Sequence, residues 1–166
     1  MQRILAIDPG LRTIGYAVVD LADNALEPKC IDAGKIALDT GLRIEGRLGQ
    51  LYDDLVSLIE EHHPHYLAVE KLFAHYRHPR TAILMAHARG VVLLCAQQAN
   101  IPVQDLSATE VKKAITGYGH ASKQQIQRAV QRQCRLPEIP SPPDVADAIA
   151  IAITFARRIA LAQIQR

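Results

Sequence analysis

Four carboxylic acids stand at points of the sequence where a fold can gather charge. Asp8 follows the apolar run RILAI and Glu70 follows YLAV, whereas Asp144 and Asp147 open a long alanine-rich apolar segment. Carboxylates held close together repel one another, so such a cluster is stable chiefly when divalent cations balance its charge. We therefore interpret the four acids as a metal site, and the chemistry that it suggests is phosphodiester cleavage.

Each acid also has an ordinary structural explanation. Asp8, in the sequence DPG, suits a turn, and Glu70 with Lys71 suits an exposed ion pair at a strand end. Asp144 and Asp147 follow two prolines and fit a helix N-cap and a first-turn acid. Their spacing of three also places both on one helix face, so the combination of four acids indicates more than each one alone.

The elements that must position these acids follow from the hydrophobic pattern. Apolar runs at 3–8, 13–20 and, after a polar loop from Asp20 to Cys30, 33–38 predict an antiparallel meander of three strands. A helical pattern over 43–61 leads to a fourth strand, YLAVE, at 66–70. The remaining segments predict helices at 79–100, 109–116 and 122–134, a strand at 101–106 and a last helix after the proline-rich loop LPEIPSPP. This order predicts a mixed five-stranded α/β sheet flanked by helices.

Length and composition favour one globular domain over residues 1–166. The chain is 49% hydrophobic, which gives a core, and it is too short for a second domain. Three widely spaced cysteines suggest neither a disulfide framework nor a zinc site. No leader-like segment opens the sequence, and the apolar stretches are interrupted, so we expect a cytoplasmic protein that does not enter a membrane.

Charge is distributed unevenly along the chain. Residues 20–70 hold 4 Lys/Arg against 11 Asp/Glu, a net −7, whereas residues 71–135 hold 10 against 2, a net +8. A basic middle favours contact with a polyanion, and nucleic acid is the usual one. The alternative is a solvated basic face with no partner.

The segment TAILMAHARGVVLLCAQQA is apolar nearly all round. A helix of this kind is buried on two sides, by its own sheet and by something else. The simplest second partner is the same helix of another subunit, which would give a homodimer with two active sites. Burial within one domain is the alternative.

Five stretches together resemble the RuvC family of Holliday-junction resolvases, which have an RNase H-like fold. They are IDPGLRTIGYAVVD, VEKLF, HPRTAILMAHARGV, GYGHASKQQIQ and DVADAIAIAIT, and they occur in family order over essentially the whole chain. The resemblance implies a homodimeric, metal-dependent endonuclease that nicks two opposing strands of a four-way DNA junction in recombination and repair. It also implies products with 5′-phosphate and 3′-hydroxyl ends, and a RuvA/RuvB-type branch-migration partner at the nucleoid.

By this resemblance, Asp8, Glu70, Asp144 and Asp147 occupy the catalytic acidic positions. Carboxylates are the ligands that Mg²⁺ prefers, and Mn²⁺ is expected to substitute for it. Two metal ions about 4 Å apart can activate water, stabilise phosphoryl charge and stabilise the leaving oxygen. We place Asp8 as the bridging ligand, with the other acids completing the two coordination shells.

The resemblance also implies residues that contact DNA. Lys123 matches a basic residue near the scissile phosphate, and Lys112 and Lys113 match a basic pair of which either one faces DNA. Phe73 matches an aromatic residue that stacks on an unpaired base. Further expected phosphate contacts are Arg77, Arg80 and Arg128. Without the family, surface lysines on helices are the ordinary explanation for the three lysines.

The sequence departs from the family pattern near these sites. Ala6 and Ala17 replace usual glycines, Lys71 replaces a common glutamine, and Ser122 stands where an acid is frequent. We expect Lys71 to put a cation beside the metal site and Ser122 to leave more positive potential around Lys123. Neither change removes an expected ligand.

Two other functions are weighed against the nuclease. IDPGLRTIGYAVVD also resembles the first phosphate-binding segment of actin-like sugar or acetate kinases, but 166 residues leave no room for their second lobe. A non-catalytic junction-binding scaffold is the other alternative, and the four intact acids argue against it.

Overall fold

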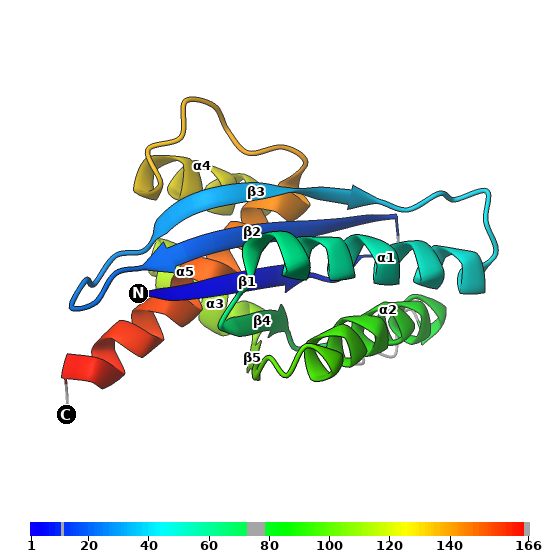
Figure 1. The fold of residues 1–166 in the computed structure, drawn as a ribbon. Coiled ribbons are helices and arrows are strands. Elements are labelled where there is room, and N and C mark those ends of the chain that lie inside the picture. The colour runs from blue at the N-terminus through cyan, green and yellow to red at the C-terminus, as the bar shows by residue number, and fades with distance from the viewer. Residues whose placement is uncertain (11, 73–78, 165–166) are drawn as a thin grey trace.

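Five strands form one mixed sheet in the order β3-β2-β1-β4-β5 (Figure 1). The computed structural model describes residues 1–10, 12–72 and 79–164. The strands are β1 (Gln2–Asp8), β2 (Thr13–Leu21), β3 (Lys29–Ala37), β4 (Tyr66–Glu70) and β5 (Val103–Leu106). β1, β2 and β3 pair antiparallel, and β4 and β5 run parallel to β1. The predicted mixed five-stranded sheet is confirmed.

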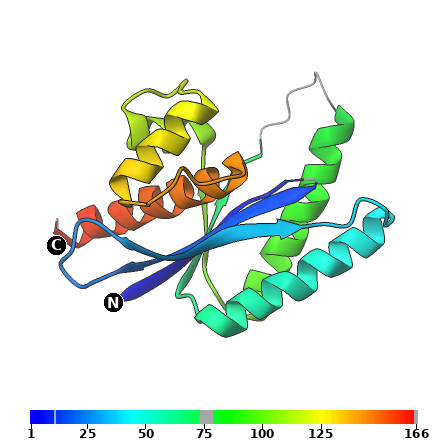
Figure 2. The same cartoon turned by 90° about the horizontal axis from the view of Figure 1, so that it is seen from above.

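Helices cover both faces of this sheet (Figures 1 and 2). One face packs against α1 (Ile44–His62) and α2 (Pro79–Gln98). The other packs against α5 (Pro143–Ile164), and α3 (Ala108–Thr116) and α4 (Lys123–Gln133) pack on α5. The result is three layers with a hydrophobic core on each side of the sheet.

Alternation along β1 divides its side chains between the two cores. Ile4 and Ala6 belong to the core under α3, α4 and α5, whereas Leu5 and Ile7 belong to the core under α1 and α2. Because successive side chains of a strand point to opposite faces, the next residue, Asp8, faces the side of α3, α4 and α5.

Small side chains let α5 lie close to the sheet. Alanines dominate its buried face, and they pack over Ala6 and Ala17 of β1 and β2. The one buried polar side chain described in this helix, that of Thr154, donates a hydrogen bond of 2.7 Å to the carbonyl oxygen of Ala150. The buried hydroxyl is thus satisfied within the helix, and contacts with β1 and β2 hold α5, whose first turns carry Asp144 and Asp147, against the sheet.

The third strand begins earlier than predicted. The sequence pattern left residues 20–30 as a polar loop, but Asp20 pairs with Lys29, and Val19 pairs with Cys30 beyond a bulge. The side chain of Asp20 is polar yet satisfied, because it accepts two hydrogen bonds from the Arg3 guanidinium at 2.8 and 2.9 Å. This pairing across strands extends the hairpin where local composition indicated a loop.

One face of α2 lies open to solvent. Ala88 and Val92 pack into the core against α1, but Ile83 and Leu94 on the opposite side are 57% and 50% exposed. We call the exposed row Ile83, His87, Gly90 and Leu94 the α2 stripe. Burial of both sides of this helix within a single chain, the alternative weighed above, is therefore wrong. Among the described residues, no helix has the length and hydropathy needed to cross a bilayer.

Candidate metal centre

Asp8 and Glu70 end two neighbouring parallel strands. The register of β1 and β4 runs up to the pair Ile7 and Val69, and each acid is the next residue of its strand. Side chains alternate along a strand, so both acids face the side of the sheet that α5 covers. Parallel pairing thus brings together two carboxylates that are far apart in the sequence.

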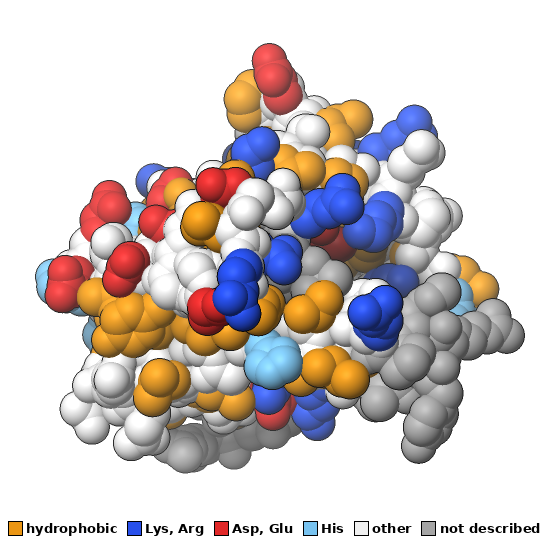
Figure 3. Space-filling model, turned by 90° about the vertical axis from the view of Figure 1, so that its right-hand side faces the viewer, with side chains coloured by type: hydrophobic (Ala, Val, Ile, Leu, Met, Phe, Trp, Pro, Cys, Tyr) orange, Lys and Arg blue, Asp and Glu red, His pale blue; other side chains and the backbone are white. Residues whose placement is uncertain are grey.

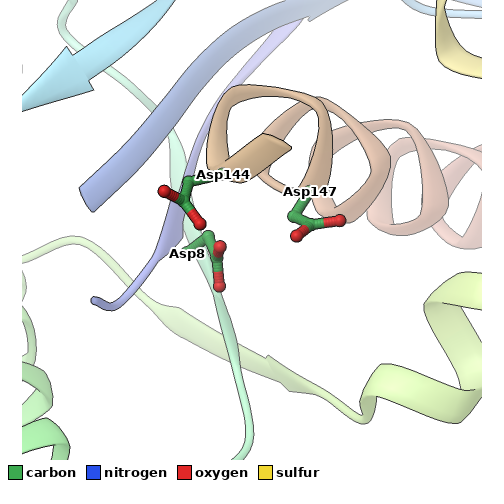
Figure 4. A group of neighbouring side chains, drawn as sticks. All are labelled: Asp8, Asp144 and Asp147. Atoms are coloured by element: carbon green, nitrogen blue, oxygen red, sulfur yellow. The ribbon is translucent and has the colours of Figure 1, made fainter. Parts of the chain in front are cut away.

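Helix α5 supplies the other two acids. It begins at Pro143, so Asp144 lies in its first turn and is not the N-cap that the sequence suggested. Asp147 follows on the same helix face, and Figure 4 shows both side chains beside Asp8 at the end of β1. One carboxylate oxygen from each of the three residues lies within 4.8 Å of the others. The three aspartates therefore form a compact cluster of oxygen ligands.

The close approach of α5 to the sheet depends on Gly15. This residue pairs with Asp8 across β1 and β2. A Cβ atom at Gly15 would lie 1.9 Å from the carbonyl oxygen of Asp144 and 2.4 Å from its carbonyl carbon. Both are backbone atoms, so no side-chain rotation can make room. This role of Gly15 was not predicted from the sequence, although a glycine inside a strand often marks such a close backbone approach.

The carboxylates line a pocket of about 310 Å³. Glu70 lies in the pocket wall, outside the cluster of three aspartates. Lys112 of α3 and Lys123 of α4 line the same pocket. Figure 3 shows Lys and Arg side chains around a recess in which acidic side chains lie. An acidic centre with a basic surround suits a phosphodiester, which needs metal at its reacting atom and cations along its backbone.

Lys123 is held in place by the start of its helix. The N–H of Gln125 donates to Ser122 Oγ at 3.3 Å, and the N–H of Ser122 donates to Gln125 Oε1 at 2.8 Å, which forms a capping box. Lys123 Nζ then lies 3.9 Å from Asp144 Oδ1 and 3.9 Å from Asp147 Oδ2. Ser122, noted above as a departure from the family pattern, is the helix cap.

The site raises the pKa of Asp8, Glu70 and Asp147. Burial, followed by the charges of Asp147, Glu70 and Asp144, raises the pKa of Asp8 from 3.8 to about 8. Burial is also the main cause of the raised pKa of Glu70 and of Asp147, with Lys123 opposing the rise in both. Nearby lysine charge therefore offsets only part of the cost of ionising the cluster.

A divalent cation fits this donor set. Carboxylate oxygens are hard ligands, and hard cations such as Mg²⁺ and Mn²⁺ prefer them. Asp8 gains most from such an ion, since its pKa stands furthest above the usual range for a carboxyl group. The cluster of Asp8, Asp144 and Asp147, with Glu70 beside it, is thus built to hold a metal.

The structure separates the two neighbouring lysines of α3. Val111 and Ile115 are buried, which turns Lys112 toward the carboxylate pocket and leaves Lys113 exposed. Lys112 also lowers the pKa of Glu70, although less strongly than burial and Asp147 raise it. Of the pair, Lys112 is therefore the one that faces the site.

Other residues selected from the sequence lie away from the pocket. Arg80 is exposed in the first turn of α2, and Arg128 is exposed on α4. The expectation that Lys71 adds a cation beside the metal site is wrong: strand alternation turns it away from Glu70, and it lines a separate pocket. Phe73 and Arg77 lie outside the described residues.

The fold and the carboxylate cluster define an RNase H-like α/β protein with a site of the metal-dependent nuclease type. A family profile described as "Crossover junction endodeoxyribonuclease RuvC" matches residues 4–155. The chain belongs to the RuvC family.

Relatives match nearly the full length of the chain. A crossover junction endodeoxyribonuclease RuvC of Brevibacillus brevis is 43% identical over 156 residues, which cover 94% of this chain and 92% of that protein. A protein of the same name from Gloeobacter violaceus is 46% identical over 153 residues, which cover 92% and 87%. The solved structure of "T. thermophilus RuvC in complex with Holliday junction substrate" has a TM-score of 0.88 and 30% identity, and the match covers 98% of this chain and 97% of that one.

Proposed function

We propose that this protein is a divalent-metal-dependent endonuclease that resolves four-way DNA junctions by paired symmetric nicks. The observation that carries the proposal is the cluster of Asp8, Asp144 and Asp147, whose oxygens lie within 4.8 Å of one another in a chain of the RuvC family. A relative of high structural similarity was solved with a Holliday junction substrate, which supports the choice of DNA. We infer a role in homologous recombination and DNA repair.

The residues of the pocket suggest how each contributes to cleavage. Asp8, Asp144 and Asp147, with Glu70, would hold two Mg²⁺ ions, or Mn²⁺ in their place. When bound, the metal supplies a water of lowered pKa and charge for the phosphoryl oxygens. Lys123, close to both aspartates of α5, stabilises negative charge that develops on the phosphate. The expected products carry 5′-phosphate and 3′-hydroxyl ends.

Cleavage of a synthetic four-way junction tests this function. With Mg²⁺ or Mn²⁺ the wild-type protein should nick two opposing strands, and it should leave a linear duplex of the same sequence intact. With EDTA both substrates should remain uncut. Equal cutting of junction and duplex would refute the substrate, and binding without cutting in either metal would indicate a scaffold.

Lys123→Ala should slow nicking about 10²-fold, because loss of one preorganised charge at the reacting phosphate typically has an effect of this size. The variant should bind the junction with little change, since one phosphate contact adds only part of the total affinity. Single-turnover nicking and binding in EDTA separate the two effects. Lys29→Ala, at an exposed lysine of β3, is the matched control. A wild-type rate for Lys123→Ala would leave this residue as an ordinary surface lysine.

We infer further that the protein acts as a homodimer through the α2 stripe. Ile83 and Leu94 are large apolar side chains that are 57% and 50% exposed. Gly90 lies between them and has no side chain, which permits two helices to approach closely. An isologous contact of this helix with its copy would give two active sites related by a two-fold axis. Two symmetric nicks need two such sites.

The double variant Ile83→Glu/Leu94→Glu should convert the dimer to a monomer, because it places four like charges at the interface of the two copies. Light scattering with size-exclusion chromatography measures the mass. Leu161→Glu/Ile164→Glu makes the same chemical changes at exposed sites of α5 and should leave the mass of the dimer unchanged. If the α2 variant keeps the wild-type mass, the proposed interface is wrong.

The remaining assignments follow from this function. We propose a single nuclease domain over residues 1–166, a cytoplasmic location at the nucleoid, and cooperation with a RuvA/RuvB-type branch-migration complex. Phe73, Arg77, Arg80, Lys112 and Arg128 remain proposed DNA contacts, and Lys113 is the less favoured member of its pair.

A further inference from the structure

A groove runs along the free edge of the sheet. β3 is the first strand in the sheet order, so it has a neighbour on one side only, which is β2. The groove has a volume of about 600 Å³, and its walls are residues 30–35 of β3 and residues 136–141, in the loop that leads from α4 to α5. Figure 1 shows this loop, in orange, passing above β3. The groove shares no lining residue with the carboxylate pocket.

The backbone along this edge has hydrogen-bonding groups to spare. In the part of the chain that the structure describes, residues 30–36 make backbone hydrogen bonds to no segment other than β2. Alternate N–H and C=O groups of an edge strand point away from its one neighbour. Beyond the bulge, the register of β3 is regular from Asp32 to Ala37. Six regular residues are enough to pair with one more strand.

The groove also offers apolar surface. Val145 and Ile149 of α5 line it and are only 7% and 1% exposed. Ile31 of β3 and Ile139 of the loop stand one on each wall, and they are 39% and 46% exposed. Exposed apolar side chains that gather along a groove are typical of a binding surface. A strand placed in the groove would cover both isoleucines.

The wall opposite β3 is held in place. Proline fixes its own backbone φ angle, and this wall contains Pro137 and Pro140. Gln127 Nε2 of α4 donates a hydrogen bond of 2.9 Å to the carbonyl oxygen of Pro140. The N–H of Leu136 donates to the carbonyl oxygen of Gln131 at 2.9 Å. The groove is therefore formed before any ligand arrives, which lowers the entropic cost of binding.

The two faces of β3 differ in charge. Ala33 packs against the core under α5, whereas Asp32 faces α1, where its Oδ2 lies 3.1 Å from His62 Nε2. Residues 20–70, which contain β3 and α1, carry the net charge of −7 noted above. A strand added to β3 would direct alternate side chains to these two faces. Apolar side chains suit the face toward α5, and cationic side chains suit the face toward α1.

We propose that this groove binds an extended segment of a partner protein, which pairs with β3 as a sixth strand and carries alternating apolar and basic side chains. Two other occupants fit less well. A second copy of this chain would bring two acidic regions together, and a nucleic acid would meet Asp32 and Glu138. The surface lies apart from the cleavage centre, so the inference goes beyond the proposed function and does not depend on it.

A designed peptide tests the added strand. The probe is the heptapeptide Lys-Val-Lys-Val-Lys-Val-Lys, capped at both ends and titrated by calorimetry into the wild-type protein in EDTA without DNA. At saturation, amide exchange within residues 32–37 should slow at least about tenfold, because the outward N–H groups gain partners. No binding at about 1 mM peptide, or protection elsewhere without any in β3, would overturn the proposal.

Modified peptides test the pairing and the charge. N-methylation of the valines blocks one edge of the peptide, and N-methylation of the lysines blocks the other. One of the two should abolish binding, and the other should not, because only one edge faces β3. Replacement of every lysine by glutamate should weaken binding at least about tenfold. Unchanged affinity for both methylated peptides, or for the glutamate peptide, would contradict the added strand.

Ile31→Ser/Ile139→Ser should weaken binding of the probe about tenfold, because it removes the exposed apolar side chains of both walls. Leu161→Ser/Ile164→Ser makes similar changes at exposed sites of α5 outside the groove and should bind like the wild type. Equal affinity of the two variants would overturn the site. A wild-type mass that rises with concentration, and does so only while Ile31 and Ile139 are intact, would assign the edge to a second copy and refute the partner. Because no step needs DNA or metal, failure here leaves the nuclease function standing.

Discussion

Asp8→Asn should reduce junction nicking by at least about 10³-fold. The substitution keeps the shape of the side chain but removes the charge of the acid that lies among Asp147, Glu70 and Asp144. A metal ion supplies several kcal/mol of transition-state stabilisation, and its binding depends on this negative charge. Single-turnover nicking in Mg²⁺ measures the effect. Asp53→Asn, at an exposed acid of α1, should nick at the wild-type rate. Paired nicks at the normal rate in Asp8→Asn would remove Asp8 from the site.

The same substitution should stabilise the metal-free protein at high pH. The pKa of Asp8 is about 8 in the folded chain and near 3.8 when unfolded, so the folded state binds the extra proton between these values. Stability therefore falls as pH rises through this window, and asparagine, which does not ionise, escapes the loss. At pH 8 in EDTA, Asp8→Asn should gain on the order of 5 kcal/mol, since each unit of pKa shift corresponds to about 1.36 kcal/mol, and at pH 4 almost nothing. Equal denaturation midpoints for the two proteins at pH 8 would contradict the raised pKa.

Gly15→Ala should reduce nicking about 10²-fold. The new Cβ would stand 1.9 Å from the carbonyl oxygen of Asp144, and relief to an ordinary contact of 3.4 Å moves the start of α5 by about 1.5 Å. A misplacement of 1 Å in a reacting group is enough for a loss of this size. The Mg²⁺ concentration for half-maximal nicking should rise as well, because Asp144 and Asp147 move away from Asp8.

Gly49→Ala is the control for this substitution. A Cβ there meets nothing within 4 Å, and in the middle of α1 alanine should stabilise the helix by about 0.5–1 kcal/mol. Thermal unfolding separates a general loss of stability in Gly15→Ala, about 1–3 kcal/mol from overpacking, from the loss of metal affinity. Wild-type Mg²⁺ dependence in Gly15→Ala would show that α5 does not set the geometry of the site.

Much of the site could be predicted because it depends on local patterns. Alternation along RILAID and YLAVE gives the face of Asp8 and Glu70, and the spacing of three gives the shared face of Asp144 and Asp147. The motif order then supplied the family. These features need only the period of a strand or helix, which the sequence carries directly.

The features that were missed or wrong depend on contacts between distant segments. The role of Gly15 appears only when α5 lies on β2, and the early start of β3 appears only when Asp20 meets Lys29 across the hairpin. Whether Lys112 or Lys113 faces the site was undecided, because the phase of α3 is set by the burial of Val111. The charge of Lys71 was expected beside the metal site because Lys71 follows Glu70 in the sequence, but its side chain lines a separate pocket.

The division of the acids between β1 and α5 has a consequence during synthesis of the protein. Asp8 precedes Asp144 and Asp147 in the sequence by more than 130 residues, and the two later acids belong to α5, which follows all five strands. A growing chain that has not yet released α5 from the ribosome lacks two of the four acids. The carboxylate cluster is therefore completed only after the sheet and its other helices have been synthesised, and a partial chain that lacks α5 carries no assembled site.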